Sequence, residues 1–229
     1  MKKTLGIIAA VFWLVFGITG VIRWTAGDSG LMAEEMLKTA PPETTGLPGK
    51  DYPGVCAMTA EHLTGRRETF QYVTAQGTDG TACMRAEVFQ DHEAAHMEDV
   101  RGLIRLDLWV CIGSGTLAVL ATAAGFLRRD GRKRFFRGMM QGILGTAGIA
   151  LLLGAWALLD FDGLFVTFHR VAFRNDGWLL NPKTDLLIRL MPVTFFIRLG
   201  VRGLLRFALF AAVFTAAVGI GLRRKKDEV

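Results

Sequence analysis

Two sequence patterns that mark common soluble enzymes are absent from this chain. It has no serine-centred nucleophile elbow and no glycine-rich loop of the kind that cradles phosphate. Cysteine is also scarce, with three in 229 residues, and the three form no catalytic or metal-binding pattern. The sequence therefore gives no support to a serine hydrolase or a phosphate-loop enzyme.

Apolar residues, by contrast, are abundant and come in long blocks. A hydrophobic share of 51% decides little by itself, because soluble domains reach similar values. Runs of about 18 or more apolar residues indicate transmembrane helices. Four runs qualify: Leu5–Ile22, about Leu106–Leu127, about Met139–Leu159 and about Leu204–Leu222. The first run is longer than the usual apolar core of a signal peptide, so we expect it to be retained as a helix.

Basic clusters at the ends of these runs orient the protein. The link Arg128–Arg137 holds six Lys or Arg, the tail Arg223–Lys226 is basic throughout, and Lys2 and Lys3 precede the first run. By the positive-inside rule these segments are cytoplasmic. The net charge of +6 reflects such anchors and gives no reason to invoke nucleic acid.

The predicted fold class is an all-α membrane protein of four transmembrane helices. A small mixed α/β extracytoplasmic cap and an interfacial or re-entrant segment before the last helix complete it. In the cap, residues 67–74 and 81–89 predict a β-hairpin, and the Pro/Gly-rich residues 40–54 predict an irregular stretch. The predicted segments are helix 1 at 1–22, the cap at 23–102, helix 2 at 103–127, a basic loop at 128–138, helix 3 at 139–159, the interfacial segment at 160–203, helix 4 at 204–222 and a basic tail at 223–229.

Small residues are expected to act as packing elements. Gly138-x-x-x-Gly142 resembles a motif that lets membrane helices approach closely, and Cys111 lies in the second apolar run. Cys56 and Cys83 fall in the outward loop, an oxidising environment in which a disulfide between them can form. Whether their backbones approach closely enough is a question of tertiary structure.

A basic stripe follows the interfacial segment. Arg198, Arg202 and Arg206 are spaced four residues apart, so they share one helical face. Two interpretations are open: the arginines snorkel to the membrane surface as anchors, or they bind a lipid phosphate or an anionic substrate.

Two of the four histidines have a setting that suits chemistry. The stretch Asp91–Trp109 begins polar and ends apolar, and as one helix it would carry His92, His96 and Asp99 on one face. His169 lies early in the second outward loop and is expected at the same membrane level as His96. Histidine acts as base or acid near neutral pH. A site there could act on a substrate whose acyl chains lie in the bilayer.

Alternatives from other classes remain open at this point. Residues 92–96, HEAAH, match the pattern of a membrane zinc metalloprotease, with His92 and His96 as ligands and Glu93 as base. Bound zinc would distinguish that reading. A non-enzymatic lipid-binding protein is the other alternative, and it would tolerate loss of the histidines.

Two blocks of residues, one before the second apolar run and one before the fourth, together resemble the signature of the lipoprotein intramolecular transacylase (Lit) family. In the cap, His62 stands where that family is expected to have tyrosine, and His92 is outside the family pattern. The first block comprises Glu93, His96, Met97, Asp99, Val100 and Arg101. The second comprises Phe168, His169, Phe173, Asn175, Asp176, Trp178, Leu179, Leu180, Pro182, Asp185, Leu187, Ile188, Pro192, Phe195 and Phe196.

The resemblance implies a bacterial plasma-membrane acyltransferase with its active site on the extracytoplasmic face. Such an enzyme moves the sn-2 acyl chain of a diacylglyceryl-modified lipoprotein to the α-amine of its N-terminal cysteine, giving a lyso-form lipoprotein. It implies no cofactor and no metal, with His96 and His169 as general base and acid in either order. We expect a monomer whose partners are membrane lipid and the diacylated lipoprotein. Supporting roles are expected for Glu93, Asp99, Arg101, Asn175, Asp176 and Trp178, and lipid contacts for Arg198, Arg202, Phe195 and Phe196.

Overall fold

The computed structural model describes residues 1–76, 84–127 and 131–223, which form two compact units. The first, here the membrane unit, comprises Met1–Ile22, Asp107–Phe161 and Gly203–Val229. The second, here the site unit, comprises Arg23–Leu106 and Asp162–Arg202. Both units draw on segments far apart in the sequence, so each depends on long-range packing.

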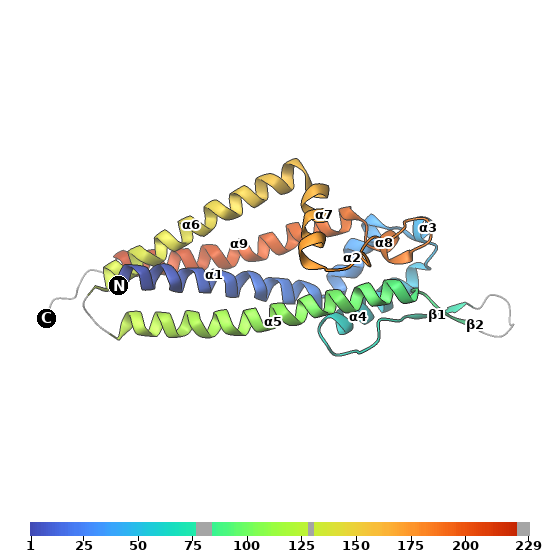
Figure 1. Ribbon diagram of the computed structural model, residues 1–229, viewed down its shortest axis with the longest axis horizontal. Helices are drawn as coiled ribbons and strands as arrows, with labels where there is room; N and C mark the ends of the chain where they lie inside the picture. The colour runs from blue at the N-terminus through green and yellow to red at the C-terminus, as the bar shows by residue number, and fades with distance from the viewer. Residues whose placement is uncertain (77–83, 128–130, 224–229) are drawn as a thin grey trace. The chain divides into compact units, whose positions relative to one another are not determined.

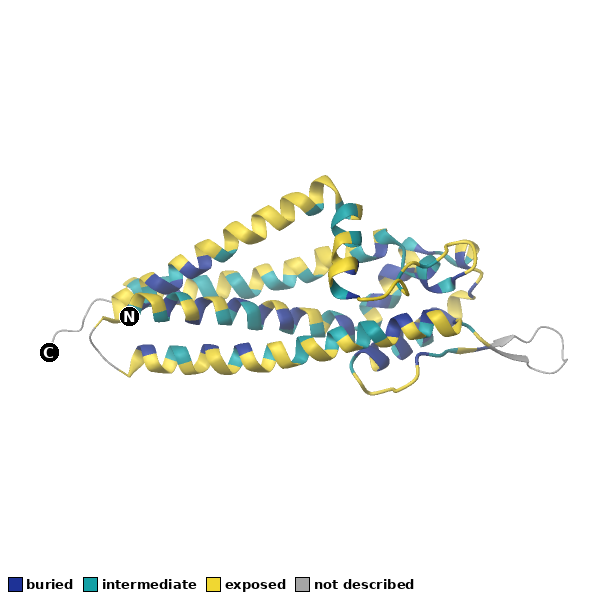
Figure 2. Cartoon of the chain, viewed as in Figure 1, coloured by how far each residue is buried: buried dark blue, intermediate teal, exposed yellow. Residues whose placement is uncertain are grey.

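Four helices are long and apolar enough to cross a membrane, which confirms the predicted runs. They are α1 (Lys2–Gly27), α5 (Asp91–Phe126), α6 (Arg132–Leu159) and α9 (Val193–Arg223). Much of their apolar surface is exposed, as the yellow ribbon of α6 shows (Figure 2). In a membrane protein such a surface faces lipid, where leaving it uncovered carries no cost. At 36 residues, α5 exceeds the roughly 20 needed to span a bilayer, and its first part is polar.

Glycines allow α1 and α6 to pack backbone against backbone. A Cβ placed on Gly138 would lie 2.0 Å from the carbonyl oxygen of Lys3, and one on Gly6 would lie 2.1 Å from that of Phe135. A Cβ on Gly142 would lie 2.9 Å from the carbonyl oxygen of Ile7. The close-packing role predicted for Gly138 and Gly142 is therefore confirmed, and no larger residue fits at either position without moving a helix.

Short elements build the site unit. Its helices are α2 (Ser29–Thr39), α3 (Pro42–Thr45), α4 (Tyr52–Leu63), α7 (Phe161–Ala172, from Asp162 on) and α8 (Leu186–Leu190), with a 3-10 turn η1 (Gly49–Asp51). Strands β1 (Val73–Gln76) and β2 (Met84–Glu87) pair antiparallel, with Val73 opposite Glu87. The core gathers apolar side chains of α2, α4, α8 and the ends of α5 and α9 around Met36, Tyr52 and Leu190.

Two stretches are more regular than the sequence predicts. Within 40–54, predicted to be irregular, the backbone forms α3 and η1. Pro42 occupies the first position of α3, where proline costs no hydrogen bond, and Gly46 ends it with a φ of 75°. Within the predicted interfacial segment, α7 is a helix of three turns, and a loop leads to the five-residue α8.

Cys56 is a free thiol enclosed in the core of the site unit. Its sulfur lies 3.8 Å from the sulfur of Met36, and burial raises the pKa of the thiol to about 12. Cys83, its expected disulfide partner, lies outside the described residues. Cys56 thus acts as a packing residue of α4 in this structure.

The contact between α1 and α6 yields a stability prediction. Gly138→Ala should lower the unfolding free energy by about 1–3 kcal/mol, because its methyl group collides with backbone that cannot rotate away. Thermal unfolding in detergent measures the effect. Gly145→Ala is the matched control on the same helix, since a Cβ there meets nothing within 4 Å. Equal melting temperatures for the two variants would show that the helices separate without cost at Gly138.

Candidate active site

Two buried histidines from distant parts of the chain lie together in the site unit. His96 is on the polar first part of α5 and His169 is on α7, and their ring centres are 6.2 Å apart. Less than a tenth of each residue is exposed. The two catalytic histidines predicted from the sequence are thus neighbours in one enclosed site.

A buried carboxylate fixes the start of α5. Glu93 is fully buried, and its Oε2 accepts a hydrogen bond of 2.8 Å from the backbone N–H of Gln90, just before the helix. Its Oε1 accepts one of 2.6 Å from the N–H of Leu187, in the first turn of α8. The first bond caps the N-terminus of α5, and the second holds α8 against it. A buried carboxylate is stable only when such donors satisfy it. Glu93 is therefore a structural member of the site.

The tautomer of His169 follows from a contact within α7. Its Nδ1 lies 2.8 Å from the carbonyl oxygen of Phe165, one turn earlier. A carbonyl only accepts hydrogen bonds, so Nδ1 carries the proton and donates. In the neutral ring, Nε2 is then left with a lone pair and can accept a proton from a substrate.

Aromatic rings enclose the pair. The ring centre of His169 lies 4.2 Å from that of Phe165, 5.3 Å from that of Trp178 and 5.5 Å from that of Phe173. Phe173 also packs edge-on against His96, with ring centres 5.1 Å apart. The rings thus surround and bury both imidazoles, and the buried Nδ1 of His96 stays without a hydrogen-bond partner among the described residues.

Asp99 and Asn175 connect the two helices that carry the histidines. The Nδ2 of Asn175, in the loop after α7, donates a 2.9 Å hydrogen bond to Oδ2 of Asp99, one turn beyond His96. The Oδ1 of Asn175 accepts one of 2.9 Å from the N–H of Gly177. Asn175 thus bridges the α7 loop to α5, so its role is one of position.

Other predicted site residues have partners elsewhere. Arg101 contacts the carboxylate of Glu98 at 3.2 Å and the carbonyl oxygen of Glu68 at 3.3 Å. Its guanidinium is thereby engaged with the loop after α4. His62, buried on α4, packs edge-on against Phe70 and lies 3.5 Å from the carboxylate of Glu98. Neither side chain contacts the histidine pair in the described contacts.

His92 contacts an acid of the second block, Asp185. Its Nε2 lies 3.0 Å from Oδ2 of Asp185. The hydrogen bond from Thr184, followed by those from His92 and the N–H of Asn181, outweighs burial and holds the pKa of Asp185 at about 2. In the described residues, no group of three or more His, Cys, Asp or Glu side chains is arranged to hold a metal ion. Within HEAAH, the carboxylate of Glu93 accepts hydrogen bonds from backbone N–H groups and the imidazole of His92 contacts Asp185.

The arginine stripe meets a buried acid. Glu35 on α2 is almost fully buried and accepts hydrogen bonds from Arg198 and from Arg202, the latter at 3.1 Å. Burial raises the pKa of Glu35, but the two arginines outweigh burial and leave it below its ordinary value. Nearly half of each arginine side chain is still exposed. The two arginines therefore tie α2 to α9 through the buried carboxylate.

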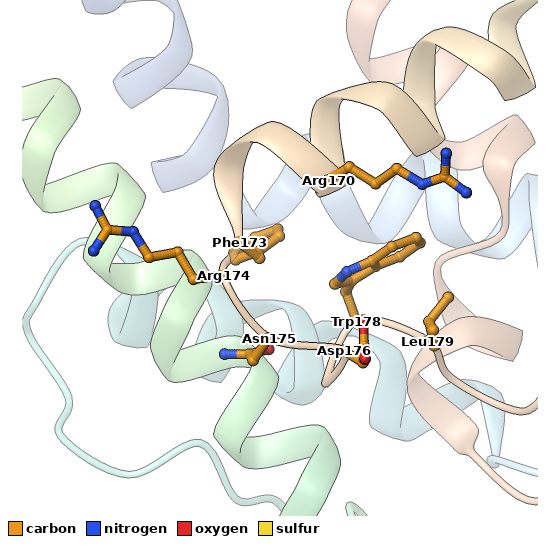
Figure 3. A pocket seen from close by; sticks show the side chains of 7 residues that line it. All are labelled: Arg170, Phe173, Arg174, Asn175, Asp176, Trp178 and Leu179. Atoms are coloured by element: carbon orange, nitrogen blue, oxygen red, sulfur yellow. The ribbon is translucent and has the colours of Figure 1, made fainter.

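Two cavities adjoin the aromatic shell of His169. The polar pocket, of about 240 Å³, is lined by Arg170, Phe173, Arg174, Asn175, Asp176, Trp178 and Leu179 (Figure 3). The apolar pocket, of about 170 Å³, includes Met191, Phe195, Phe196 and Leu199 among its lining. Phe196 packs against Phe165 with ring centres 5.2 Å apart, and Phe165 in turn contacts His169. Trp178 packs on His169 and also lines the polar pocket.

Sequence reasoning missed three residues of this site. Phe165 fixes the tautomer of His169 through its carbonyl, and its i−4 position on a helix was the available signal. Arg170 and Arg174 line the polar pocket. The available signal was their i,i+4 spacing, which is the same as that of the arginine stripe.

Asp185 gives a stability prediction with a defined pH range. Its carboxyl has a lowered pKa in the folded protein, so it contributes stability that is present above its ordinary pKa of 3.8 and lost as pH falls toward about 2. Asp185→Asn should lower the melting temperature at pH 7 and weaken its fall below pH 4. Glu61→Gln, an exposed change on α4, is the control. A melting temperature that falls in acid equally in Asp185→Asn and in the native protein would contradict the assignment.

Comparisons with known proteins agree with this architecture. The family model of the lipoprotein intramolecular transacylase Lit matches residues 7–196. No curated protein matches the sequence. Among solved structures, the membrane integral lipoprotein intramolecular transacylase Lit from Bacillus cereus superposes with a TM-score of 0.76 at 15% identity, covering 100% of this chain and 99% of that one.

A second structure of the Bacillus cereus protein, in which one histidine is replaced by arginine, gives a TM-score of 0.66 at 18% identity, over 96% of this chain and 92% of that one. At such low identities the structural likeness shows the fold, a membrane-integral helical one. The family match spans most of the sequence and includes both histidine blocks. The chain is thus a multi-pass membrane protein that belongs to the lipoprotein intramolecular transacylase family.

Proposed function

We propose that this protein moves the sn-2 acyl chain of a diacylglyceryl-modified lipoprotein to the α-amine of the same molecule's N-terminal cysteine. The product is a lyso-form lipoprotein. Family membership supports the reaction class, and the buried pair His96–His169 is the observation that carries the chemistry. No cofactor is needed, because an ester and an amine react by proton transfer and positioning alone.

The proposed reaction replaces the ester C–O bond with an amide C–N bond and moves one proton from nitrogen to oxygen. The amine nitrogen attacks the carbonyl carbon of the sn-2 ester, and a histidine takes the proton that the nitrogen loses. The tetrahedral intermediate then expels the glycerol oxygen, which receives a proton from the other histidine. An amide and a free hydroxyl result, so atoms and charge balance.

The geometry favours His169 as the base. Its Nδ1–H donates to the Phe165 carbonyl, which leaves Nε2 as an acceptor. His96 is then the acid. Burial and the neighbouring His169 lower the pKa of His96 and Asp99 offsets this only in part, so a proton placed on His96 is readily given up. With ring centres 6.2 Å apart, the imidazoles would repel each other if both were charged. In the proposed cycle, His169 gains the proton that the amine loses, His96 gives one to the glycerol oxygen, and solvent restores both rings to their starting states.

The enclosure by aromatic rings supplies the remaining requirements. Excluding water strengthens each hydrogen bond to the reacting groups and protects the ester from hydrolysis. The indole N–H of Trp178 has no hydrogen-bond partner within the described residues, and its ring packs on His169. We assign it as a donor to the oxyanion of the tetrahedral intermediate. Because one molecule provides both reactants, orientation can contribute ~7 kcal/mol or more.

Histidine substitutions test the assignment. His96→Ala and His169→Ala should each lower acyl transfer by a factor on the order of 100 or more, as expected for loss of a general acid or base. His92→Ala should keep most activity, since His92 contacts Asp185 and lies outside the pair. The measurement is mass spectrometry of the lipoprotein's N-terminal peptide after reaction with purified protein.

His92→Ala is the matched control, because it removes an imidazole one helical turn away on the same helix. Treatment with a chelator should leave the rate unchanged. If His92→Ala is as damaging as His96→Ala and chelation stops turnover, the HEAAH segment holds a metal and the proposed chemistry is wrong.

The reaction also requires the site unit to face outward, where mature lipoproteins are anchored. Cysteines placed singly at exposed positions in a cysteine-free background test this. Lys50→Cys, in the site unit, should react with a membrane-impermeant thiol reagent added to intact cells, and Lys133→Cys, at the start of α6, should not. Labelling at position 133 alone would reverse the topology.

A further inference from the structure

The polar pocket has charged groups that the proposed reaction leaves unused. Arg170 and Arg174 are exposed, and neither has a polar partner within the described part of the chain. Asp176 lines the same pocket and is likewise exposed and unpaired there. Two positive groups and one negative group give the pocket a net positive charge. It lies one ring from the site, since Trp178 lines it and packs on His169.

The pocket's place beside His169 restricts which part of a substrate reaches it. A lipoprotein has apolar chains on one side of its modified cysteine and polypeptide on the other. His169 likewise has an apolar pocket beyond Phe165 and Phe196, and the polar pocket beyond Trp178. With the reacting amine and ester at the histidines, an acyl chain suits the first cavity and the polypeptide suits the second.

The orientation of the arginines favours an extended ligand. In Figure 3 the two side chains extend to opposite sides of the pocket, with Phe173, Trp178 and Asp176 between them. The two arginines thus flank the pocket and do not converge on one point, which suits an extended ligand better than a single phosphate group. A peptide running across the pocket meets an arginine at each side and a carboxylate between, which can accept its N–H groups.

We propose that the polar pocket binds the first residues of the lipoprotein that follow its N-terminal cysteine, and that Arg170 and Arg174 make it prefer acidic over basic side chains there. The inference rests on the proposed function for the identity of the substrate. It adds a specificity site in which the protein selects among lipoproteins by the charge next to their lipid anchor.

Lipopeptides that differ only in charge provide the test. Three peptides share the diacylglyceryl-cysteine and have Asp, Asn or Lys at the three positions after it. Native protein in zwitterionic phospholipid vesicles should show kcat/KM in the order Asp, Asn, Lys, with steps of about three- to tenfold, the range for partly exposed ion pairs. The differences should fall on KM, because peptide binding outside the reacting centre stabilises ground and transition states alike.

Charge reversal supplies the decisive comparison. The double variant Arg170→Glu/Arg174→Glu should invert the order, so that the Lys peptide reacts best. Should it fail to fold, Arg170→Gln/Arg174→Gln should remove the preference. Lys50→Glu is the control, because it reverses a positive charge at an exposed residue of the site unit outside the pocket, and it should keep the native order.

The outcomes separate the two proposals. If no peptide yields lyso product, the proposed function fails. If all three peptides react equally in native protein, or if charge reversal slows all three alike, the pocket does not read peptide charge and the inference is overturned. A response of the native protein to added anionic phospholipid, lost in the double variant and independent of peptide charge, identifies a lipid headgroup site and also overturns it.

Discussion

The arrangement of the site depends on one buried carboxylate. Glu93 begins α5 by accepting the N–H of Gln90, and it anchors α8 by accepting the N–H of Leu187, 94 residues away in the sequence. A carboxylate with no exposed surface is tolerated only when donors satisfy it, so both backbone segments must be in place for either to be stable. The constraint fixes the helix that carries His96 relative to the block that follows His169.

Further polar contacts repeat this strategy in the site unit. His92 and Asp185 join α5 to the residue before α8, Asn175 and Asp99 join the α7 loop to α5, and Glu35 joins α2 to α9 through two arginines. Each connects segments that meet only in the folded chain. The fold of the site unit is therefore defined in part by hydrogen bonds to charged groups, which are stronger than hydrogen bonds between neutral groups. The polar residues near the histidine pair are thus engaged with one another rather than with the imidazoles.

The setting of the histidines suits an amphiphilic substrate. Apolar contacts extend from His169 through Phe165 and Phe196, while Trp178 leads to a cavity bordered by arginines. A reaction between two groups of one lipid-modified cysteine needs both surroundings at once. The aromatic rings between them are apolar, rigid and broad, so they can separate the two and keep water from the reacting ester.

Much of the fold and part of the site follow from the sequence by itself. Hydrophobic runs determine the four long helices, because a bilayer accepts only segments whose backbone bonds are internal. The two histidine blocks determined the family and the candidate pair. Helical spacing could place His92, His96 and Asp99 on one face, but that face gave no way to tell which imidazole serves the site and which serves the fold.

Only the tertiary structure shows what each imidazole contacts. His92 contacts Asp185, and Glu93 accepts the N–H of Leu187. Two residues of the zinc-like pattern therefore have partners about 90 residues away, which helical periodicity in the sequence cannot reveal. The partners of Arg101, the carbonyl oxygen of Glu68 and the carboxylate of Glu98, likewise appear only in the folded chain. The polar pocket combines residues of α7 with a loop whose path depends on Asn175 reaching Asp99. Sequence patterns report local periodicity and composition, whereas side-chain partners depend on which distant segments packing brings within hydrogen-bond range.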